Sequence, residues 1–188
     1  GSTMWEEVNR IVRGGNYEYP WREGNSLQAG ETRPATLRGT PTPPVLFYRH
    51  TAFLRSVIGG TVYRGTRWPA LAGRYLFMDN YSGELMGIAA DAPPLTERWE
   101  TLARSAEVAQ RGVTALIEAP DGDVLVSVMG DNDHPTGMIA RLAEAGAAGA
   151  EVLQPVVAGV VTRADAMRLF GVNCARCHGA HGRGDGPD

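Results

Sequence analysis

The stretch "SVIGGTVYRGTRWPALAGRYLFMDNYSGELMGI", residues 56–88, decides the fold class of this chain. It holds short apolar or alternating runs at 56–64 and 73–78, and a third that extends over 83–89. The last two are separated only by the turn residues of "YSG". Short β-prone runs joined by so tight a turn predict antiparallel neighbouring strands. One further strand, at about 96–102, would complete a four-stranded unit.

The same pattern recurs on both sides of this stretch. Downstream, "VTALIEA" at 113–119, "DVLVSVM" at 123–129 and "GMIARL" at 137–142 predict three more strands, and upstream "PVLFYR" at 44–49 predicts another. The downstream unit leaves a fourth strand to be supplied from elsewhere. Both units are typical of β-propeller blades. The prediction is a mainly β fold over residues 1–142, formed by the last blades of a propeller.

Composition excludes several classes of function. The formal net charge of -3 gives no electrostatic footprint for binding nucleic acid. All 18 basic residues are arginine, so no mechanism within these residues can use a lysine amine. No apolar run approaches the length of a membrane span. We therefore expect no nucleic-acid partner and no membrane span here.

The composition changes at residue 143. Residues 143–161 are rich in alanine and glycine, which predicts a linker. From Thr162 the spacing becomes helical, with Thr162 as a candidate N-cap and Gly171 as the expected end of the helix. The predicted organisation is a partial propeller over 1–142, this linker, and the start of a second, helical domain over 162–188.

A Cys-x-x-Cys-His motif follows the predicted helix, formed by Cys174, Cys177 and His178. Two thiols at this spacing can form thioethers with the vinyl groups of a haem, and the adjacent imidazole can then ligate the iron. Three other interpretations remain open: a thioredoxin-type redox pair, a zinc site using His178 and His181, or a structural pair. The first expects a βαβ context and the second a fourth ligand at standard spacing.

The residues around the motif, "DAMRLFGVNCARCHGAHGRGDGP" at 165–187, resemble the opening of a class I cytochrome c. The resemblance implies haem c as the cofactor, with Cys174 and Cys177 as the thioether residues and His178 as the proximal ligand of the haem iron. It implies a distal ligand beyond Asp188. Because covalent haem attachment is completed outside the cytoplasmic membrane, it also implies a periplasmic or otherwise exported bacterial protein.

The propeller part resembles the glucose/sorbosone dehydrogenase family, whose propellers often bind pyrroloquinoline quinone (PQQ). Three segments carry the resemblance: "WEEVNRIVRGGNYEYPWREG" at 5–24, the stretch at 56–88, and 113–142. Glu18 and Tyr19 depart from the family pattern, which has glycine and tryptophan there. The resemblance covers roughly the last third of such a propeller.

This resemblance implies a quinone held by a lysine and by closely spaced arginines. The lysine position falls at Tyr81 or Ser82, and Arg111 is the one candidate quinone-binding arginine, one residue out of register. The family's catalytic histidine would lie upstream of Gly1, so no catalytic residue is assigned. Its main-chain calcium ligands map near Gly1 and Ser2.

Two functional hypotheses follow. In the first, the chain is a fragment, cut at both ends, of an exported quinohaemoprotein that oxidises a sugar and passes electrons to a c-type haem. A respiratory acceptor or another cytochrome would be its partner, and PQQ and calcium its further cofactors. In the alternative, the propeller is a non-catalytic binding or scaffolding module that carries an electron-transfer cytochrome. An opened propeller exposes edge strands, so we expect the isolated chain to be poorly soluble.

Overall fold

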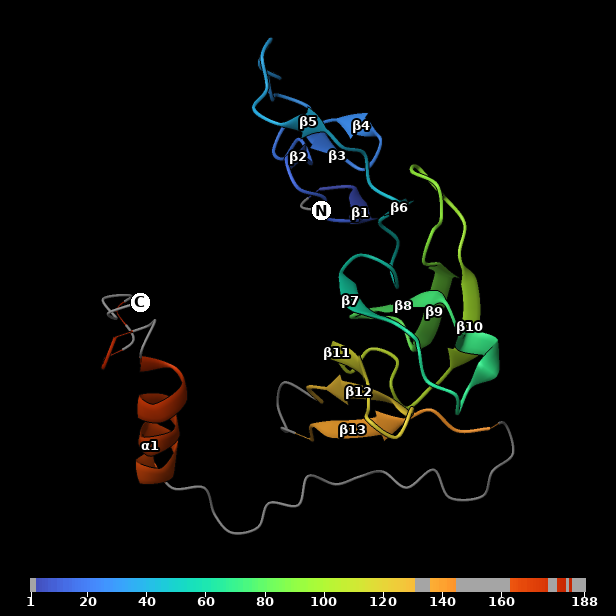
Figure 1. Ribbon diagram of the computed structural model, residues 1–188, viewed down its shortest axis with the longest axis vertical. Coiled ribbons are helices and arrows are strands. Elements are labelled where there is room, and N and C mark those ends of the chain that lie inside the picture. Colours follow the sequence, from blue (N-terminus) through green and yellow to red (C-terminus); the bar gives the residue numbers. More distant parts are fainter. Residues whose placement is uncertain (1–2, 131–135, 145–162, 176–178, 182, 184–188) are drawn as a thin grey trace. The chain divides into compact units, whose positions relative to one another are not determined.

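The computed structural model describes residues 3–130, 136–144, 163–175, 179–181 and 183. The chain divides into two units, Gly1–Gln154 and Pro155–Asp188. The first consists of β-strands, and the described part of the second contains one helix, α1 (Arg163–Asn173) (Figure 1). Most of the predicted linker, from Ala145 to Val161, lies outside the described residues.

The strands of the first unit form two larger sheets and three short pairs. The larger sheets are β10-β9-β8-β7 and β11-β12-β13, and the pairs are β1-β6, β2-β5 and β3-β4. The strands are β1 (Trp5–Val8), β2 (Gly15–Asn16), β3 (Arg22–Glu23), β4 (Ser26–Leu27), β5 (Thr40–Pro41), β6 (Leu46–Arg49), β7 (Val57–Val62), β8 (Arg74–Asp79), β9 (Glu84–Ala89), β10 (Glu100–Arg104), β11 (Val113–Glu118), β12 (Val124–Val128) and β13 (Met138–Arg141). A 3-10 turn at Pro69–Leu71 lies between β7 and β8.

The mainly β prediction is confirmed, and each strand predicted from 44 to 142 has a counterpart. β7, β8 and β9 are the three runs of the stretch at 56–89, and they pair antiparallel as expected. The fourth strand, β10, begins at Glu100 instead of at about 96. The three downstream runs are β11, β12 and β13, also antiparallel.

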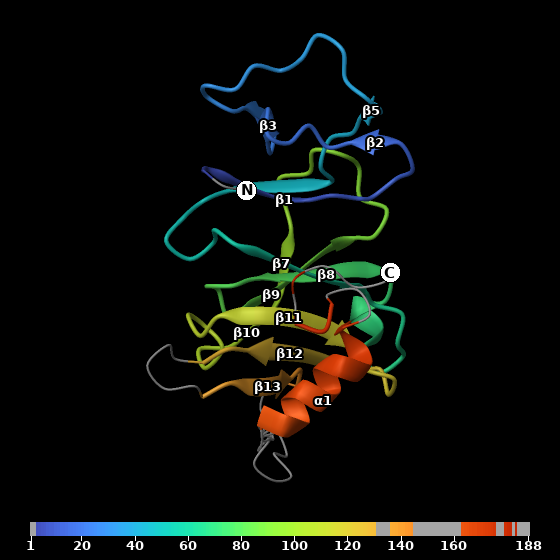
Figure 2. The same cartoon turned by 90° about the vertical axis from the view of Figure 1, so that its left-hand side faces the viewer.

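The sheets are stacked, and β8 contributes to the hydrophobic core on both of its faces. Figure 2 shows β1, the four-stranded sheet and the three-stranded sheet as successive layers. Leu76 and Met78 of β8 pack toward the three-stranded sheet, whereas Tyr75 and Phe77 pack with the cluster that includes β6. Successive residues of a strand point to opposite faces, so the unbroken apolar run from Tyr75 to Met78 suits the middle of a stack.

Gly60 allows β7 to lie close to β8. A Cβ atom added there would stand 2.3 Å from the carbonyl oxygen of Leu76, closer than side-chain carbons come in proteins. The register between β7 and β8 shifts between Ile58 and Thr61, so Gly60 lies within a β-bulge or irregularity of the pair. The second glycine of "IGGT", Gly60, therefore has a steric role in the sheet.

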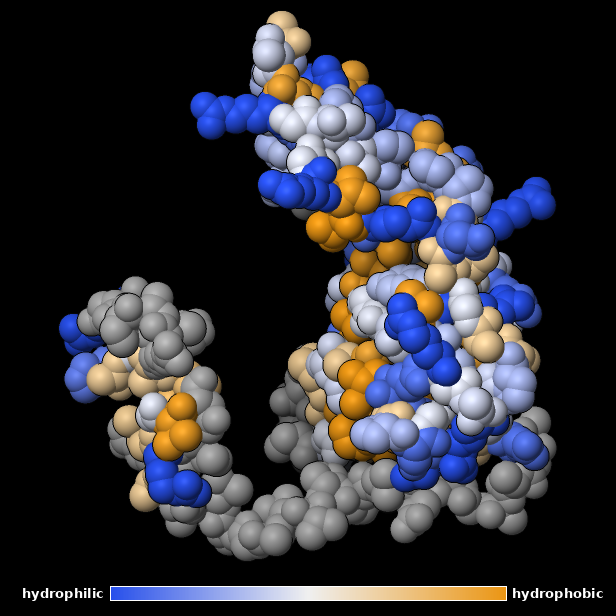
Figure 3. Space-filling view, viewed as in Figure 1, coloured by the Kyte–Doolittle hydropathy of each residue, from blue (hydrophilic) through white to orange (hydrophobic). Residues whose placement is uncertain are grey.

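The three-stranded sheet has one covered and one open face. Val124, Val126 and Val128 of β12 are buried toward the four-stranded sheet, while Leu125 and Ser127 between them are half-buried. Figure 3 shows hydrophobic residues gathered over the region of β7 and β11–β13. Ile117 of β11 is 54% exposed.

Helix α1 extends past the residue at which the sequence predicted its end. It continues through Gly171 to Asn173, and the described glycines with positive φ do not include Gly171. A glycine inside a helix costs only about 1 kcal/mol relative to alanine, so the helix can continue through it. The expected stop at Gly171 is therefore wrong by two residues. Thr162, the candidate N-cap, lies outside the described residues.

Replacing Leu76 with alanine should destabilise the stack strongly, because its side chain is fully buried between the sheets. We expect the Leu76→Ala variant to lose about 2–5 kcal/mol of unfolding free energy, measured by urea denaturation followed by circular dichroism. Leu27→Ala is the matched control, since Leu27 is 62% exposed, and it should change stability by less than about 0.5 kcal/mol. Equal effects of the two substitutions would contradict the assigned core.

Candidate functional site

Three loops meet at one end of the four-stranded sheet and form a continuous rim. They are the residues just before β7, the β8–β9 turn and the β10–β11 connection. Asn80 donates its backbone N–H to the Ser56 carbonyl (2.8 Å) and accepts from the Val113 N–H (3.1 Å). Its side-chain amide also donates to the Val113 carbonyl (2.8 Å). The Gln110 N–H donates to the Tyr81 carbonyl (3.0 Å), which ties the second and third loops together.

The rim continues onto the three-stranded sheet. The Met129 and Gly130 N–H groups donate to the Gly112 and Arg111 carbonyls, both at 2.9 Å. Gly112 and Gly130 have φ angles of 72° and 90°, which favour glycine over other residues. We call the residues Ser56, Asn80, Tyr81, Gln110, Arg111, Gly112, Val113, Met129 and Gly130 the loop rim.

The buried carboxylate of Asp79 accepts hydrogen bonds that hold the loop rim in position. It is the last residue of β8 and is fully buried. One carboxylate oxygen accepts from the Tyr48 hydroxyl (2.7 Å) and the Ser56 N–H (2.7 Å), and the other accepts from the Tyr81 N–H (3.1 Å). Because these donors come from three segments, the carboxylate fixes the relative positions of β6, the start of β7 and the β8–β9 turn.

Tyr48 is the buried partner of this carboxylate. Burial raises the pKa of the Tyr48 phenol, and its hydrogen bond to Asp79 and the negative charge of that residue raise the pKa further. Tyr48 therefore stays a neutral donor to Asp79 over the physiological range. Its ring also contacts Trp99, with the two ring centroids 5.4 Å apart.

Tyr81, at the position where the family resemblance expects a lysine, lies in the loop rim and is half-buried. The guanidinium of Arg55 lies over its ring, with the central carbon 4.2 Å from the ring centroid. Such a cation–π contact is worth about 0.5–1 kcal/mol at an exposed site. A positive charge is thus present beside Tyr81, although it comes from another loop. Ser82, the other possible lysine position, is buried.

Arg111, the candidate quinone-binding arginine, also belongs to the loop rim. The structure therefore brings Tyr81 and Arg111 to the same end of neighbouring sheets, and a quinone-binding role for Arg111 stays a prediction. The Arg111 side chain is half-buried, and one of its guanidinium nitrogens donates to the Met138 sulfur at 3.8 Å. This contact directs at least part of the guanidinium toward β13.

A hollow of 340 Å³ adjoins the loop rim. It is lined by both polar and apolar groups, among them Phe53, Tyr81, Ser82, Glu84 and Arg104. Glu84 and Arg104 pair across it at 3.2 Å. The hollow has room for a small polar ligand, with a hydroxyl, a carboxylate and a guanidinium as hydrogen-bonding groups.

Of the predicted haem residues, Cys174 is described and Cys177 and His178 lie outside the described residues. Cys174 is a free, half-buried cysteine directly after α1, and its N–H donates to the Phe170 carbonyl at 2.8 Å. The Gly179 N–H donates to the Ala175 carbonyl at 2.8 Å, a helix-like bond. Haem attachment through the motif stays a prediction.

No metal cluster and no membrane span is found in the described part of the chain. No group of three or more His, Cys, Asp or Glu side chains there could hold a metal ion. No helix there is long and apolar enough to cross a membrane. Gly1 and Ser2, where the family's calcium ligands map, lie outside the described residues.

Comparison with known proteins relates the chain to glucose dehydrogenase at the level of the fold. No family model matches. The HIPL1 protein of Arabidopsis thaliana is 34% identical over 102 residues, which are 49% of this chain and 15% of that protein. A crystal structure of glucose dehydrogenase matches with a TM-score of 0.50 and 18% identity, covering 74% of this chain and 38% of that one. The chain thus spans well under half of either protein, and its β unit has a dehydrogenase-like β fold.

Sequence reasoning missed two residues of the site. Asp79 lies one residue beyond the strand predicted at 73–78, but it ends β8 and is buried. Two of its three donors, Tyr48 and Ser56, are distant in sequence, so no local pattern marks its role. Arg55 resembles any exposed turn arginine, and only the arrangement of the loops shows that it covers Tyr81.

The raised pKa of Tyr48 predicts a specific loss of stability in alkali. The fold favours the neutral phenol, so this contribution is complete below roughly pH 10, the unfolded pKa, and is lost as the pH rises above it. We expect the urea midpoint of the natural sequence to fall more steeply between about pH 9 and about pH 11 than that of Tyr48→Phe. Tyr19→Phe, at a tyrosine that is 71% exposed, should keep the natural steepness. Identical pH profiles for all three proteins would contradict the role of the Tyr48–Asp79 bond.

Proposed function

We propose that this chain is part of an exported electron-transfer protein, in which a sugar-dehydrogenase-like propeller passes electrons to a c-type haem. One observation carries the proposal. A chain whose β unit has a fold similar to that of glucose dehydrogenase also holds a Cys-x-x-Cys-His motif in its second unit. A periplasmic or otherwise exported location is part of the proposal, because covalent haem attachment is completed there.

The haem would be held by three residues. Cys174 and Cys177 would bond its vinyl groups through their sulfurs, and the His178 imidazole would ligate its iron. The bound haem would act as a one-electron carrier. The half-buried thiol of Cys174 at the end of α1 supports this assignment, since attachment requires a thiol that the porphyrin can reach.

Joining the two units in one polypeptide favours electron transfer between them. A linker of about 20 residues keeps its two ends at roughly millimolar effective concentration, so the units need not find each other by diffusion. A respiratory acceptor or another cytochrome would then take the electron from the haem.

Two arginines lie in or next to the loop rim: Arg55 covers the Tyr81 ring, and Arg111 belongs to the rim with a guanidinium nitrogen on the Met138 sulfur. The chain has no lysine to supply an ammonium group. A quinone that gathers negative charge on reduction is stabilised by such cations. Even so, the rim does not fit the family's pattern for holding PQQ, because the lysine is absent and the Arg111 guanidinium contacts Met138. The proposal therefore assigns sugar oxidation, with PQQ and calcium, to a longer protein of which this chain is a part.

The same residues favour a second candidate function. With Tyr81 in place of the lysine, the propeller can instead be a non-catalytic binding or scaffolding module that carries the cytochrome. Dye reduction by the longer protein, reconstituted with PQQ and calcium and tested on a panel of aldoses, separates the two functions. Turnover with any sugar supports the dehydrogenase, and no turnover with any of them supports the binding module.

Haem attachment is testable on the 188-residue chain itself. Exported into the periplasm of a bacterium that matures c-type cytochromes, the chain should gain the mass of one haem and show the absorption of a reduced c-type cytochrome. Cys174→Ala and Cys177→Ala should each remove one of the two thioethers. His178→Ala should remove the proximal ligand and change the absorption spectrum.

His181→Ala is the matched control, since it removes a histidine three residues beyond the proposed ligand. It should leave the mass gained from the haem and the absorption spectrum unchanged. A colourless protein that binds zinc, and that loses zinc affinity in His181→Ala, would instead support the zinc site. A colourless protein without bound metal would leave the electron-transfer proposal without a basis.

A further inference from the structure

A hollow of 490 Å³ lies at the end of the four-stranded sheet that is opposite the loop rim. The end of β9, the start of β10 and the connection between them form its walls, and Arg74 at the start of β8 borders it. We call it the β9–β10 hollow. Its volume falls within the roughly 300–1,000 Å³ of sites that bind small molecules. Because β10 is the fourth strand of this sheet, the unit predicted from the sequence is already complete here.

The β9–β10 connection, which walls the hollow, is held by hydrogen bonds to the segments after β1 and before β6. The Arg10 guanidinium donates to two carbonyls of the connection, at 2.6 and 3.2 Å. The Leu95 and Thr96 N–H groups donate to carbonyls just before β6, at 2.8 and 3.0 Å. Figure 1 shows the connection reaching the neighbourhood of β6. Leu95 has a φ of 61°, so these bonds hold a backbone conformation that leucine rarely adopts.

Trp99 forms the apolar part of the hollow, together with Ile88 and Ala92. The indole is half-buried, and its ring packs on that of Tyr48 with centroids 5.4 Å apart and an interplanar angle of 57°. Tyr48 is itself fixed by its bond to Asp79. The hollow therefore has a flat aromatic wall whose orientation is set by the core.

Two guanidinium groups and two carboxylates also line the hollow, so its charges cancel. Arg74 pairs with Glu100 at 2.5 Å. Arg98 and Asp91 are exposed, and within the described part of the chain neither side chain has a hydrogen-bond or ion-pair partner. Thr96 adds a hydroxyl group. The hollow thus presents hydrogen-bond donors and acceptors without a net charge.

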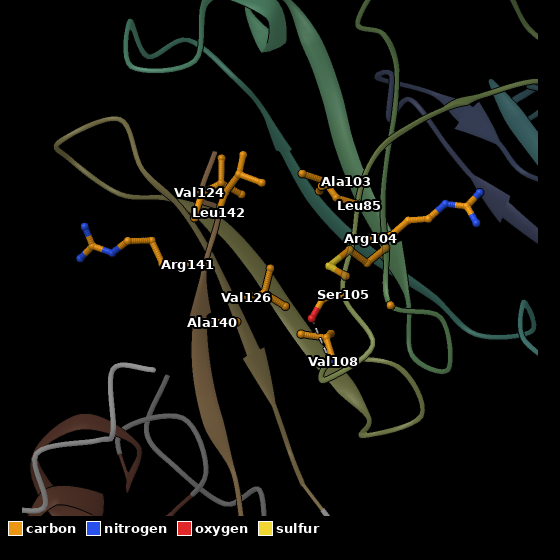
Figure 4. Close-up of a pocket in the computed structure, with 13 residues that line it drawn as sticks. Leu85, Ala103, Arg104, Ser105, Val108, Val124, Val126, Ala140, Arg141 and Leu142 are labelled. Atoms are coloured by element: carbon orange, nitrogen blue, oxygen red, sulfur yellow. Dashed lines mark hydrogen bonds between the residues drawn. The ribbon is translucent and has the colours of Figure 1, made fainter. Parts of the chain in front are cut away.

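The 240 Å³ cleft between the two sheets has a different character. Figure 4 shows valine and leucine side chains on its walls, with the side chains of Arg104 and Arg141 pointing away from it. It borders β13, where the sequence predicts a further strand supplied from elsewhere. Such a strand would cover the cleft, so we assign no ligand to it.

We propose that the β9–β10 hollow binds a short stretch of a neutral oligosaccharide. Sugar hydroxyls both donate and accept hydrogen bonds, whereas a carboxylate only accepts and a guanidinium only donates, so Asp91 and Arg98 complement them. The C–H face of a sugar ring would lie on the indole of Trp99. An ion is favoured less, because the lining has no net charge, and an apolar ligand would cover charged groups without giving them hydrogen bonds.

A peptide chain suits the hollow less well than a sugar. An extended peptide adds to an open strand edge, and the edge strand here, β10, has a register shift between Thr101 and Ala103. Such irregularities blunt the edge of a sheet. The proposed site lies at the opposite end of the sheet from the loop rim, and it depends neither on haem attachment nor on sugar oxidation.

Oligosaccharide binding to the 188-residue chain tests the proposal. The probes are maltotetraose, cellotetraose and laminaritetraose, titrated by calorimetry and by tryptophan fluorescence. At least one should bind with one-to-one stoichiometry and change the fluorescence. Arg98→Ala and Asp91→Ala should each weaken that binding at least fivefold, because each removes a hydrogen-bonding group. Both side chains are exposed, so the variants should fold like the natural chain.

Two further variants locate the bound sugar. Glu97→Ala is the matched control, since Glu97 is exposed beside Arg98 but does not line the hollow, and it should leave binding unchanged. Trp99→Phe keeps an aromatic ring against Tyr48 and should remove the fluorescence change.

Three results would overturn the proposal. The first is the absence of binding by all three probes, or binding that neither Arg98→Ala nor Asp91→Ala weakens. The second is binding that Tyr81→Ala abolishes and Arg98→Ala does not, which would place the sugar at the loop rim and support the proposed function instead. The third is tighter binding of tetragalacturonate, an anionic oligosaccharide of the same length, which would rule out a site for neutral sugars.

Discussion

The buried carboxylate of Asp79 is the interaction on which the loop end of the β unit depends. It accepts hydrogen bonds from Tyr48, Ser56 and Tyr81, which belong to three different segments. A buried charge without partners is very unfavourable, whereas one that accepts several hydrogen bonds is tolerated and fixes the groups that donate them. The loop rim, and with it Tyr81 and the Arg55 that covers it, is built on this carboxylate.

The stacking of the sheets determines which loops and side chains lie together at the loop end of the β unit. β8 supplies apolar side chains to both of its faces, so the four-stranded sheet is covered on both sides. Because β7 to β10 are antiparallel neighbours, the start of β7, the β8–β9 turn and the end of β10 lie at one end of their sheet. Backbone hydrogen bonds of Val113, Met129 and Gly130 continue the rim onto the three-stranded sheet. Tyr81, which stands at the expected lysine position, and Arg111 lie in the same rim, and the role of Arg111 in quinone binding stays a prediction.

Much of the fold could be predicted from the sequence, because most of the longer strands are marked by local sequence patterns. In 56–89 and 113–142 the apolar runs are short and the turns between them are marked by glycine, asparagine and aspartate, so strand positions follow from the pattern. The two-residue strands β2 to β5 are too short to show such a pattern, and the pairing of β2 with β5 joins residues about 25 apart in the sequence. The role of Asp79 could not be predicted either, since its donor Tyr48 is 31 residues away. The direction of the Arg111 guanidinium depends on Met138, which lies on another strand.

In the proposed function, a dehydrogenase-like propeller and a c-type haem act in one polypeptide, with electrons passing from the first to the second. Stopped-flow absorbance of a haem-loaded protein containing the complete propeller, mixed with its sugar, measures this directly. The account predicts that ferrous haem appears with a rate constant independent of protein concentration, because the transfer is intramolecular. A haem that stays ferric while the sugar is oxidised, or a rate proportional to protein concentration, would contradict it.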